Sequence, residues 1–318
     1  MPKETSERVG VIGLGLLGRG IVVSVASSGQ EVVACDRSAE ALARAGEHLS
    51  EALGEMVRHG VLSESEAERA RGRVRFTGSA RDLADRTFVI ESVVEDAASK
   101  ASVFDELERI LADEAVVASN TSAIPISTLQ AGRRIPARFV GMHWGEPCHI
   151  SRFNEIIRGD LTGDEAFERA RCLAEACGKE PSLVRRDIRG FVTNRLMYAM
   201  LREAFHLLES GVADVETIDR SFRNDMGYWA TFAGPFRFLD LTGVEAYLRV
   251  AEGLFAELSD DKAPPSWLRE MVERGALGVE SGEGFYKYTP DDAARWHRDW
   301  ERFTWDVRKL ADRHPVER

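Results

Sequence analysis

The segment Val9-Gly10-Val11-Ile12-Gly13-Leu14-Gly15-Leu16-Leu17-Gly18 decides the fold of the N-terminal part of this sequence. It begins with a short apolar run typical of a buried strand, and a series of glycines then ends that run. Residues 18–27 are mostly small and apolar, which favours a helix packed closely on a sheet, and Glu31–Cys35 form a second apolar run. The stretch therefore predicts a strand, a helix and a second strand in one βαβ unit.

The glycines of this segment have the spacing of a dinucleotide-binding fingerprint. In that fingerprint Gly13 permits a tight turn, Gly15 lets the backbone approach a pyrophosphate, and Gly18 lets the helix touch the strand. The helix N-terminus, which includes Leu16 and Leu17, offers free N–H groups to the phosphates. The pattern predicts a bound dinucleotide, and its alternative is a turn that is only tightly packed.

The residue that follows the second predicted strand indicates which dinucleotide binds. Asp36 stands there, and a carboxylate in that place accepts hydrogen bonds from a ribose diol and repels a 2′-phosphate. The adjacent Arg37 could stack on the adenine. We therefore expect NAD rather than NADP as the cofactor, with Asp36 and Arg37 in its site.

The next part of the chain extends the sheet around an inserted helical hairpin at about residues 39–73. Gly60 favours the end of its first helix, and Ser63 with Glu66 forms a capping box for its second. An α/β domain with a doubly wound, largely parallel sheet is predicted for residues 1–187. Its further strands are expected at residues 87–94, 115–118, 139–143, 155–157 and 180–184.

The character of the sequence changes near Asp187. Residues 194–210 are apolar over much of a helical circumference, as expected for a buried core helix. Helical periodicity then continues to the end of the chain. We expect an all-α second domain at residues 188–318, packed closely on the first.

Composition and charge exclude several classes of protein. The formal net charge of −11 disfavours nucleic acid as a partner, and no apolar run approaches the roughly 18 residues of a membrane span. The polar segment 1–8 does not resemble a signal peptide, and no cluster has metal-ligand spacing, so we assign no metal. A cytoplasmic location is expected because the cysteines show no disulfide or CxxC pattern: Cys35, Cys148, Cys172 and Cys177.

Several later segments, in their order and spacing, resemble the 3-hydroxyacyl-CoA dehydrogenase family over nearly the whole chain. They are Glu91-Ser-Val-Val-Glu95 with Lys100, Ala118-Ser-Asn-Thr-Ser122, Gly141-Met-His143, Asn154-Glu155-Ile-Ile, Gly190-Phe-Val-Thr-Asn194-Arg-Leu, Gly234-Pro-Phe-Arg-Phe-Leu-Asp240 and Gly282-Glu-Gly-Phe-Tyr286.

The resemblance implies a Rossmann-type first domain, a helical second domain that forms a homodimer, and an enzyme of fatty acid metabolism. It implies a catalytic pair of His143 and Glu155. Ser122 and Asn194 would lie near the reacting carbon. Three further residues would face the cofactor: Glu95, Lys100 and Asn120.

Oxidation of a secondary alcohol explains why such residue types are needed. An imidazole accepts the hydroxyl proton near neutral pH, and a carboxylate on its other nitrogen fixes the tautomer and stabilises the imidazolium. Ser122 and Asn194 could hold the hydroxyl or carbonyl of the substrate in place. Each residue also has a purely structural alternative: a buried histidine, a surface carboxylate at a strand end, a turn residue and a helix cap.

The sequence departs from the acyl-CoA pattern around the predicted catalytic histidine. Typical members follow that histidine with two aromatic residues, an asparagine and a proline, whereas this chain has Trp144-Gly145-Glu146-Pro147. Residues 148–153 are more polar than usual, and the turn of the helical hairpin lacks lysine. Arginines near that turn could meet coenzyme A phosphates or could be solvated: Arg58, Arg69 and Arg71.

Three hypotheses follow. The first is NAD-dependent oxidation of a 3-hydroxyacyl thioester, with coenzyme A or a carrier protein on the acyl group. The second is oxidation of a small free 3-hydroxy acid such as gulonate or carnitine, for which Arg152 or Arg237 could bind the carboxylate. The third is an NAD-binding protein without catalytic activity, which the intact set of candidate residues disfavours.

Overall fold

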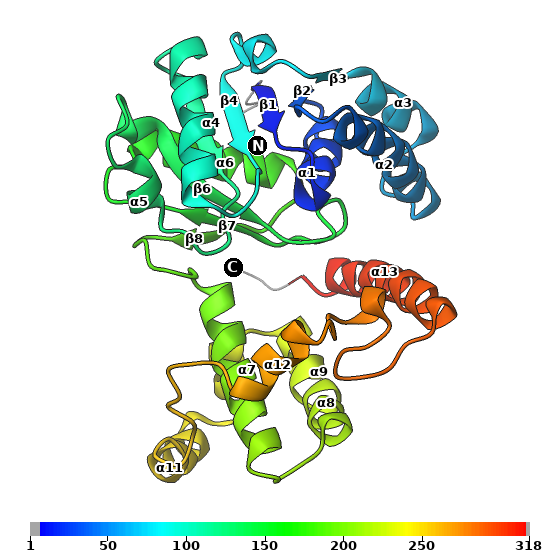
Figure 1. Cartoon of the computed structure of the whole chain (residues 1–318), viewed down its shortest axis with the longest axis vertical. Helices are drawn as coiled ribbons and strands as arrows, with labels where there is room; N and C mark the ends of the chain where they lie inside the picture. Colours follow the sequence, from blue (N-terminus) through cyan, green and yellow to red (C-terminus); the bar gives the residue numbers. More distant parts are fainter. Residues whose placement is uncertain (1–6, 316–318) are drawn as a thin grey trace. The chain divides into compact units, whose positions relative to one another are not determined.

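The computed structural model describes residues 7–315, so most of the polar segment 1–8 lies outside the described residues. Contacts divide the chain into two compact units, Met1–Asn194 and Arg195–Arg318. The domain boundary expected after residue 187 stays a prediction. The first unit contains the sheet and the second is helical, as the fold class predicted (Figure 1).

The first unit is built on an eight-stranded sheet with the order β3-β2-β1-β4-β5-β6-β7-β8. All neighbouring strands are parallel except β6 and β7, whose pairing is antiparallel. The strands are β1 (Arg8–Ile12), β2 (Glu31–Cys35), β3 (Val74–Thr77), β4 (Phe88–Glu91), β5 (Val116–Ser119), β6 (Phe139–Trp144), β7 (Asn154–Ile157) and β8 (Ser182–Val184).

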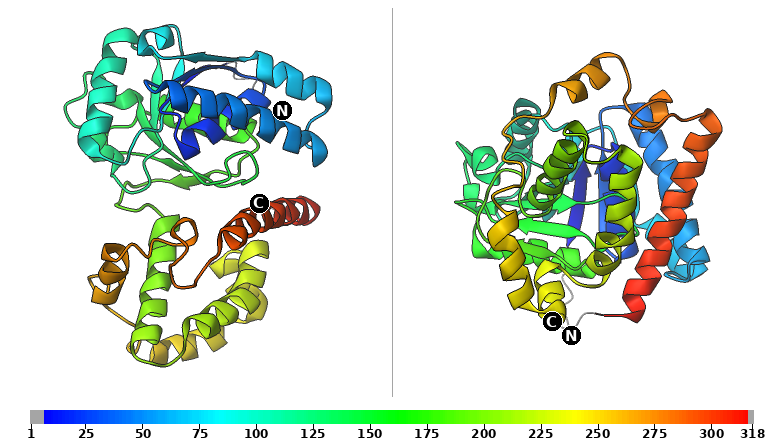
Figure 2. Two further views of the ribbon diagram at one scale, coloured as in Figure 1. Left: turned by 45° about the vertical axis from the view of Figure 1, so that its right-hand side comes forward. Right: turned by 90° about the horizontal axis from the view of Figure 1, so that it is seen from below.

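Helices cover both faces of this sheet. α1 follows β1 toward β2 and α4 follows β4 toward β5, so right-handed crossovers place the two helices on opposite faces. The hairpin of α2 and α3 packs against α1 (Figures 1 and 2). The helices of this unit are α1 (Leu16–Ser27), α2 (Ala39–Arg58), α3 (Glu64–Gly72), α4 (Ala97–Ile110), α5 (Ile126–Gln130) and α6 (Asp164–Ala176), with short 3-10 turns η1 (Ala80–Leu83) and η2 (Pro136–Arg138).

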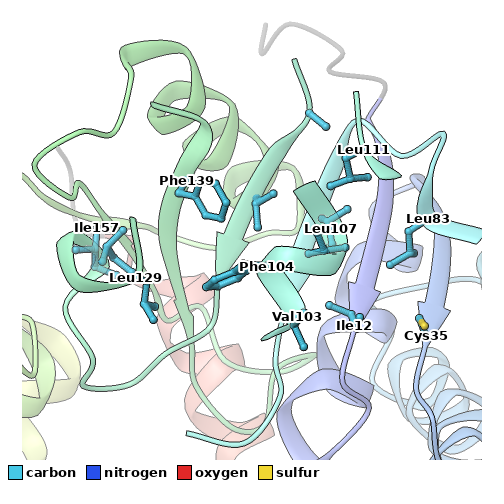
Figure 3. Close-up of a cluster of buried hydrophobic side chains, with 14 of the residues drawn as sticks. Ile12, Cys35, Leu83, Val103, Phe104, Leu107, Leu111, Leu129, Phe139 and Ile157 are labelled. Atoms are coloured by element: carbon cyan, nitrogen blue, oxygen red, sulfur yellow. The ribbon is translucent and has the colours of Figure 1, made fainter. Parts of the chain in front are cut away.

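The main core of the unit lies between the sheet and α4. Phe104 and Leu107 of α4 are fully buried there, and the Phe104 ring packs edge-on against Phe139 of β6 at a centroid distance of 5.3 Å (Figure 3). Each such side chain contributes roughly 1.5–3 kcal/mol of burial free energy. This core fixes the carboxyl ends of β1, β4, β5 and β6 at one edge of the sheet.

The helical hairpin and one edge strand of the first unit differ in how far the sequence predicts them. The hairpin is present, and the Ser63 side chain accepts from the Glu66 N–H while Glu66 accepts from the Ser63 N–H, which confirms the capping box. The edge strand β3 was not predicted. Its side chains are at most half-buried, so its sequence lacks a strong apolar signal.

The second unit contains helices and short turns. The helix expected at residues 194–210 is α7, but no residue of α7 is buried, so the prediction of a buried core helix was wrong for this chain alone. The helices are α7 (Thr193–Glu209), α8 (Val215–Asn224), α9 (Met226–Phe232), α10 (Pro235–Thr242), α11 (Val244–Leu254), α12 (Ser266–Glu273) and α13 (Pro290–Arg313), with the turn η3 (Val279–Ser281). Among the described residues, no helix is long and apolar enough to cross a membrane.

Candidate active site

The glycine-rich loop between β1 and α1 is shaped by steric contact. A Cβ atom on Gly13, whose φ is +91°, would lie 2.7 Å from the Ser92 carbonyl, and one on Gly18 would lie 1.8 Å from the Gly13 carbonyl oxygen. Nothing lies within 4 Å of a Cβ built on Gly15. Gly13 and Gly18 therefore allow close packing, whereas the backbone at Gly15 faces the open space that a pyrophosphate needs.

Asp36 is tied to this loop. Its Oδ2 accepts a hydrogen bond from the Leu14 N–H at 2.7 Å, and its Oδ1 accepts one from the Ser38 N–H at 2.8 Å. Each carboxylate oxygen has a second lone pair that remains for a ribose diol. Arg37 beside it is exposed. These residues fit the adenosine half of a dinucleotide, and their roles stay predictions.

His143 and Glu155 form a buried pair on neighbouring strands. The antiparallel register sets His143 of β6 directly opposite Glu155 of β7, and the His143 Nδ1 lies 2.9 Å from the Glu155 Oε2. His143 is 7% exposed and Glu155 is 0% exposed. The offset of twelve residues between them is thus spanned by the ends of two strands and the loop that joins them.

The second oxygen of Glu155 is held by the turn that precedes α7. Its Oε1 accepts hydrogen bonds from the N–H groups of Val192 at 3.1 Å and Thr193 at 2.9 Å. The residue before them, Phe191, is fully buried and has a φ of +49°, a conformation that costs a non-glycine residue of order 1–3 kcal/mol. That turn directs two successive N–H groups at one carboxylate.

These contacts set the charge of Glu155. Burial raises the pKa of its carboxyl, but the hydrogen bonds from His143 and from the N–H groups of Thr193 and Val192 outweigh burial, so the pKa lies below its usual value. The carboxylate is therefore ionised at neutral pH. As an acceptor only, it requires the proton of a neutral His143 ring on Nδ1 and leaves Nε2 as the acceptor.

Ser122 and Asn194 lie in the same network. The Asn194 amide Nδ2 donates to the Ser122 carbonyl at 2.7 Å, which ties the start of α7 to the turn after β5. Glu95 holds the other side of that turn, because its Oε1 accepts from the N–H groups of Ser122 at 2.9 Å and Ala123 at 3.0 Å. The turn that carries Ser122 is thus fixed from two directions.

Asn120 and Glu95 follow the carboxyl ends of β5 and β4, and their contact with a cofactor stays a prediction. The Asn120 side chain donates to the Ser92 hydroxyl at 3.0 Å and accepts from the Trp144 N–H at 2.8 Å, which joins β4, β5 and β6. Burial raises the pKa of Glu95, but hydrogen bonds from Thr121 and the charge of Lys100 lower it below its usual value. Glu95 is therefore an anion with a half-exposed side chain at this edge.

Lys100 lies behind this surface. It is fully buried, and its Nζ lies 2.8 Å from the Glu91 Oε1 and 3.4 Å from the Glu95 Oε2. Glu91 is also fully buried, and its Oε2 accepts from the Ser119 hydroxyl at 2.6 Å. The sequence placed Lys100 in the lining of the cleft, whereas the structure has it supporting Glu95 from below. The sequence motif that contains Glu91 did not predict this buried contact.

The loop after β6 carries a carboxylate where an amide is usual. Burial raises the pKa of Glu146, with His149 and Arg19 acting in the opposite direction. Arg152, which was a candidate for binding a substrate carboxylate, is paired with Glu180 at 2.6 Å. Its charge is therefore already engaged within the protein.

The fold and the glycine-rich loop define the class of protein as a dinucleotide-binding dehydrogenase. The family model described as "3-hydroxyacyl-CoA dehydrogenase, NAD binding domain" matches residues 8–188, and "3-hydroxyacyl-CoA dehydrogenase, C-terminal domain" matches residues 190–288. The chain belongs to the 3-hydroxyacyl-CoA dehydrogenase family and is an NAD-dependent oxidoreductase. This confirms the resemblance, the enzyme class and the cofactor that the sequence predicted.

Two of the named relatives differ in the substrate that their names give. A probable 3-hydroxybutyryl-CoA dehydrogenase of Deinococcus radiodurans is 40% identical over 282 residues, which are 88% of this chain and 100% of that protein. The 5-formyl-3-hydroxy-2-methylpyridine 4-carboxylate 5-dehydrogenase of Mesorhizobium japonicum is 36% identical over 307 residues, which are 96% of this chain and 98% of that protein.

Similar solved structures include enzymes of both of these kinds. A crystal structure of a 5-formyl-3-hydroxy-2-methylpyridine 4-carboxylic acid 5-dehydrogenase has a TM-score of 0.90 at 35% identity, covering 96% of this chain and 98% of its own. An (S)-3-hydroxybutyryl-CoA dehydrogenase from Ralstonia eutropha has a TM-score of 0.75 at 33% identity, covering 89% of this chain and 100% of its own.

The glycine loop yields a matched pair of substitutions. Gly15→Ala should leave the free energy of unfolding within about 1 kcal/mol of wild type, because its Cβ meets nothing, yet weaken NAD binding tenfold or more, ~1.4 kcal/mol. Gly18→Ala should cost roughly 1–3 kcal/mol of stability through its clash with Gly13. Calorimetric NAD titration and urea unfolding measure both. Equal effects of the two variants on NAD binding and stability would contradict this division of roles.

The buried pair of Glu91 and Lys100 yields a second prediction. Lys100→Met leaves the Glu91 carboxylate buried without its cation, which should cost about 3–5 kcal/mol in urea unfolding. Adding Glu91→Gln removes that charge, so the double variant should be more stable than Lys100→Met alone. A double variant whose loss equals the sum of the two single losses would show that the two side chains are not coupled.

Proposed function

We propose that the protein oxidises the 3-hydroxyl of a 3-hydroxyacyl thioester to the 3-keto form, with His143 and Glu155 as its general base pair. The observation that supports this most directly is the buried contact of 2.9 Å between His143 Nδ1 and Glu155 Oε2, beside the network that holds Ser122 and Asn194. A dyad of this kind is the arrangement that alcohol oxidation needs.

In the proposed reaction the substrate C–H and O–H bonds break as the carbonyl forms. His143 Nε2 takes the hydroxyl proton, because Nδ1 already carries the proton that is shared with Glu155. NAD, when bound, accepts the hydride. The ionised Glu155 then stabilises the imidazolium, and its own contacts with Val192 and Thr193 keep it from moving with the proton.

Ser122 and Asn194 are proposed to hold the substrate. Their backbone and amide atoms are engaged with each other and with Glu95, whereas the Ser122 hydroxyl stands on a turn whose backbone is already fixed. A polar group held in this way positions a substrate oxygen without reorganisation. Glu95 and Asn120 are proposed to line the nicotinamide half of the cleft.

Two observations support a thioester as the substrate. The 3-hydroxybutyryl-CoA dehydrogenase of Deinococcus radiodurans, at 40% identity, is matched over its whole length. Arg69 and Arg71 stand exposed in the last turn of α3, where they are available to phosphates. We keep the thioester as the leading substrate class for these reasons.

A small acid that is not a thioester is the second candidate, and a different observation favours it. The C-terminal family model ends at residue 288, before α13 begins at Pro290. The Mesorhizobium pyridine carboxylate dehydrogenase matches 96% of this chain, against 88% for the Deinococcus relative. The solved structure of such a pyridine carboxylate dehydrogenase has a TM-score of 0.90, against 0.75 for the (S)-3-hydroxybutyryl-CoA dehydrogenase, and the name of its substrate contains no coenzyme A.

We also propose a homodimer through the helical unit. α11 carries Val244 and Leu248, and Phe255 directly follows its end; each of the three is more than half exposed in the single chain. Leu196 and Tyr198 of α7 are exposed as well. A second copy that covers these faces would supply the apolar burial that the unit does not find among its own described residues.

The proposed chemistry predicts a specific loss. His143→Gln should reduce kcat for NADH formation by about 10²–10⁴-fold, because the hydroxyl proton then has no acceptor, while the affinity for NAD stays unchanged. The substrates to test are 3-hydroxybutyryl-CoA, longer 3-hydroxyacyl-CoA esters, free 3-hydroxybutyrate, carnitine, gulonate and 5-formyl-3-hydroxy-2-methylpyridine 4-carboxylate.

Each pattern of turnover decides between the two substrate classes. Turnover of a coenzyme A ester that His143→Gln abolishes supports the leading proposal, and turnover of free acids alone transfers support to the second. Wild-type activity that survives in His143→Gln would refute the role of the histidine. His314→Gln is the matched control, since it makes the same exchange on an exposed residue at the end of α13.

The dimer proposal is tested by sedimentation velocity. Wild type should sediment as a dimer, and Leu248→Glu should shift it toward monomer, because a carboxylate would then be buried at the interface. Lys262→Glu, on an exposed residue of the same unit, should leave the dimer intact. A monomeric wild type would refute the proposal.

A further inference from the structure

Two aromatic rings contact the His143 imidazole. Phe191 lies at a ring-centroid distance of 5.9 Å, and Phe153 packs at 5.3 Å with the two ring planes at 89°. Phe191 is fully buried and belongs to the turn that holds Glu155. Phe153 is half-buried and comes from the loop between β6 and β7, next to the strand that carries Glu155.

The Phe153 ring fills the space into which a side chain at position 145 would extend. A Cβ built on Gly145 would lie 2.7 Å from Phe153 Cδ1 and 3.4 Å from its Cγ. The acyl-CoA pattern has an aromatic residue at position 145. An aromatic side chain at position 145 would clash with the present Phe153 ring. This chain therefore has a glycine at 145 and an aromatic ring at 153, where the usual pattern has its aromatic residue at 145.

The loop that carries Phe153 is fastened to the rest of the unit. The buried Lys179 Nζ donates to the carbonyls of Cys148 and Ser151, and it lies 5.3 Å from the centroid of the Trp144 ring. The Ser24 hydroxyl also donates to the Cys148 carbonyl, at 2.8 Å. A buried ammonium that binds two carbonyls of one loop restrains the path of that loop.

A further hydrogen bond within the loop holds the backbone of Phe153. The Ser151 hydroxyl accepts from the Phe153 N–H at 3.0 Å, which sets the direction of the backbone immediately before β7. The ring position is therefore determined by the fastened loop on one side and by the strand on the other. The ring so placed packs edge-to-face with the His143 imidazole.

We propose that Phe153 is a positioning residue for His143, and that its ring replaces the aromatic residue that the usual pattern has at position 145. Contact with Phe153 keeps Nδ1 of the imidazole on Glu155 and Nε2 directed at the substrate. The effect on catalysis rests on the proposed function, whereas the effect on the imidazole itself does not.

The test is an exchange of the two residues. Phe153→Ala should lower kcat about tenfold, ~1.4 kcal/mol, with a smaller change in KM, because the base is less often in position while substrate binding is kept. Gly145→Phe should lower kcat and stability through its clash with Phe153. The double variant Gly145→Phe with Phe153→Ala should recover most of kcat, since it restores one ring in one space.

Phe76→Ala is the matched control, since Phe76 is equally half-buried but lies on β3, at the far edge of the sheet from β6. It should lower stability and leave kcat unchanged. Unchanged kcat in Phe153→Ala, or a double variant that is no better than Gly145→Phe alone, would overturn the proposal.

A measurement without substrate separates this proposal from the proposed function. The ¹⁵N spectrum of the imidazole rings, assigned to His143 by its loss in His143→Gln, should show one tautomer with Nδ1 protonated in wild type. In Phe153→Ala it should show averaging of the two nitrogen shifts. A wild type inactive on every substrate with this spectral change intact would refute the proposed function alone, and an unchanged spectrum would refute the role of Phe153.

Discussion

The buried carboxylate of Glu155 is the constraint on which the rest of the site depends. An ionised carboxyl removed from water costs several kcal/mol unless hydrogen bonds replace its hydration. Glu155 is 0% exposed and accepts from His143 on one strand and from Val192 and Thr193 before α7. Because each of these donors satisfies the same anion, the antiparallel register of β6 and β7 and the left-handed turn at Phe191 must be present together. The strain of that turn is offset by the charge that it stabilises.

The same principle is repeated at the neighbouring strand ends. Glu95 is held as an anion by Thr121, Lys100 and the N–H groups of the turn that carries Ser122, and Glu91 lies below it against the same lysine. Asn194 then joins that turn to the residue that follows Thr193. The chain of contacts runs without a break from Lys100 to His143. These contacts hold the side chains of the candidate site to one another without any substrate, which is the kind of arrangement that electrostatic preorganisation requires.

The sequence predicted the structure correctly where residues close together in the chain determine it. The glycine fingerprint, the capping box at Ser63 and the strand-type runs each depend on residues close in the chain, and the structure contains all of them. The juxtaposition of His143 with Glu155 needed only an antiparallel turn-back over twelve residues. Phe153 was not foreseen, because its contact with His143 depends on where Lys179 fastens the loop, 26 residues further on. The buried ion pair of Lys100 was not predicted, because an amphipathic helix does not reveal which lysine turns inward to a buried glutamate.

The error at α7 has a different physical origin. Apolar residues around a helix indicate that its surface is buried away from water. They do not indicate which molecule covers that surface. Leu196 and Tyr198 are both at least 60% exposed in the single chain. Burial of apolar area contributes roughly 25 cal/mol per Å², whether the same chain or another chain buries it. A sequence pattern therefore fixes the need for burial but leaves its source open. In the first unit that need is met by the sheet, so pattern and burial agree there. In the helical unit the same pattern leaves apolar faces exposed, and these are the faces that the proposed homodimer would bury.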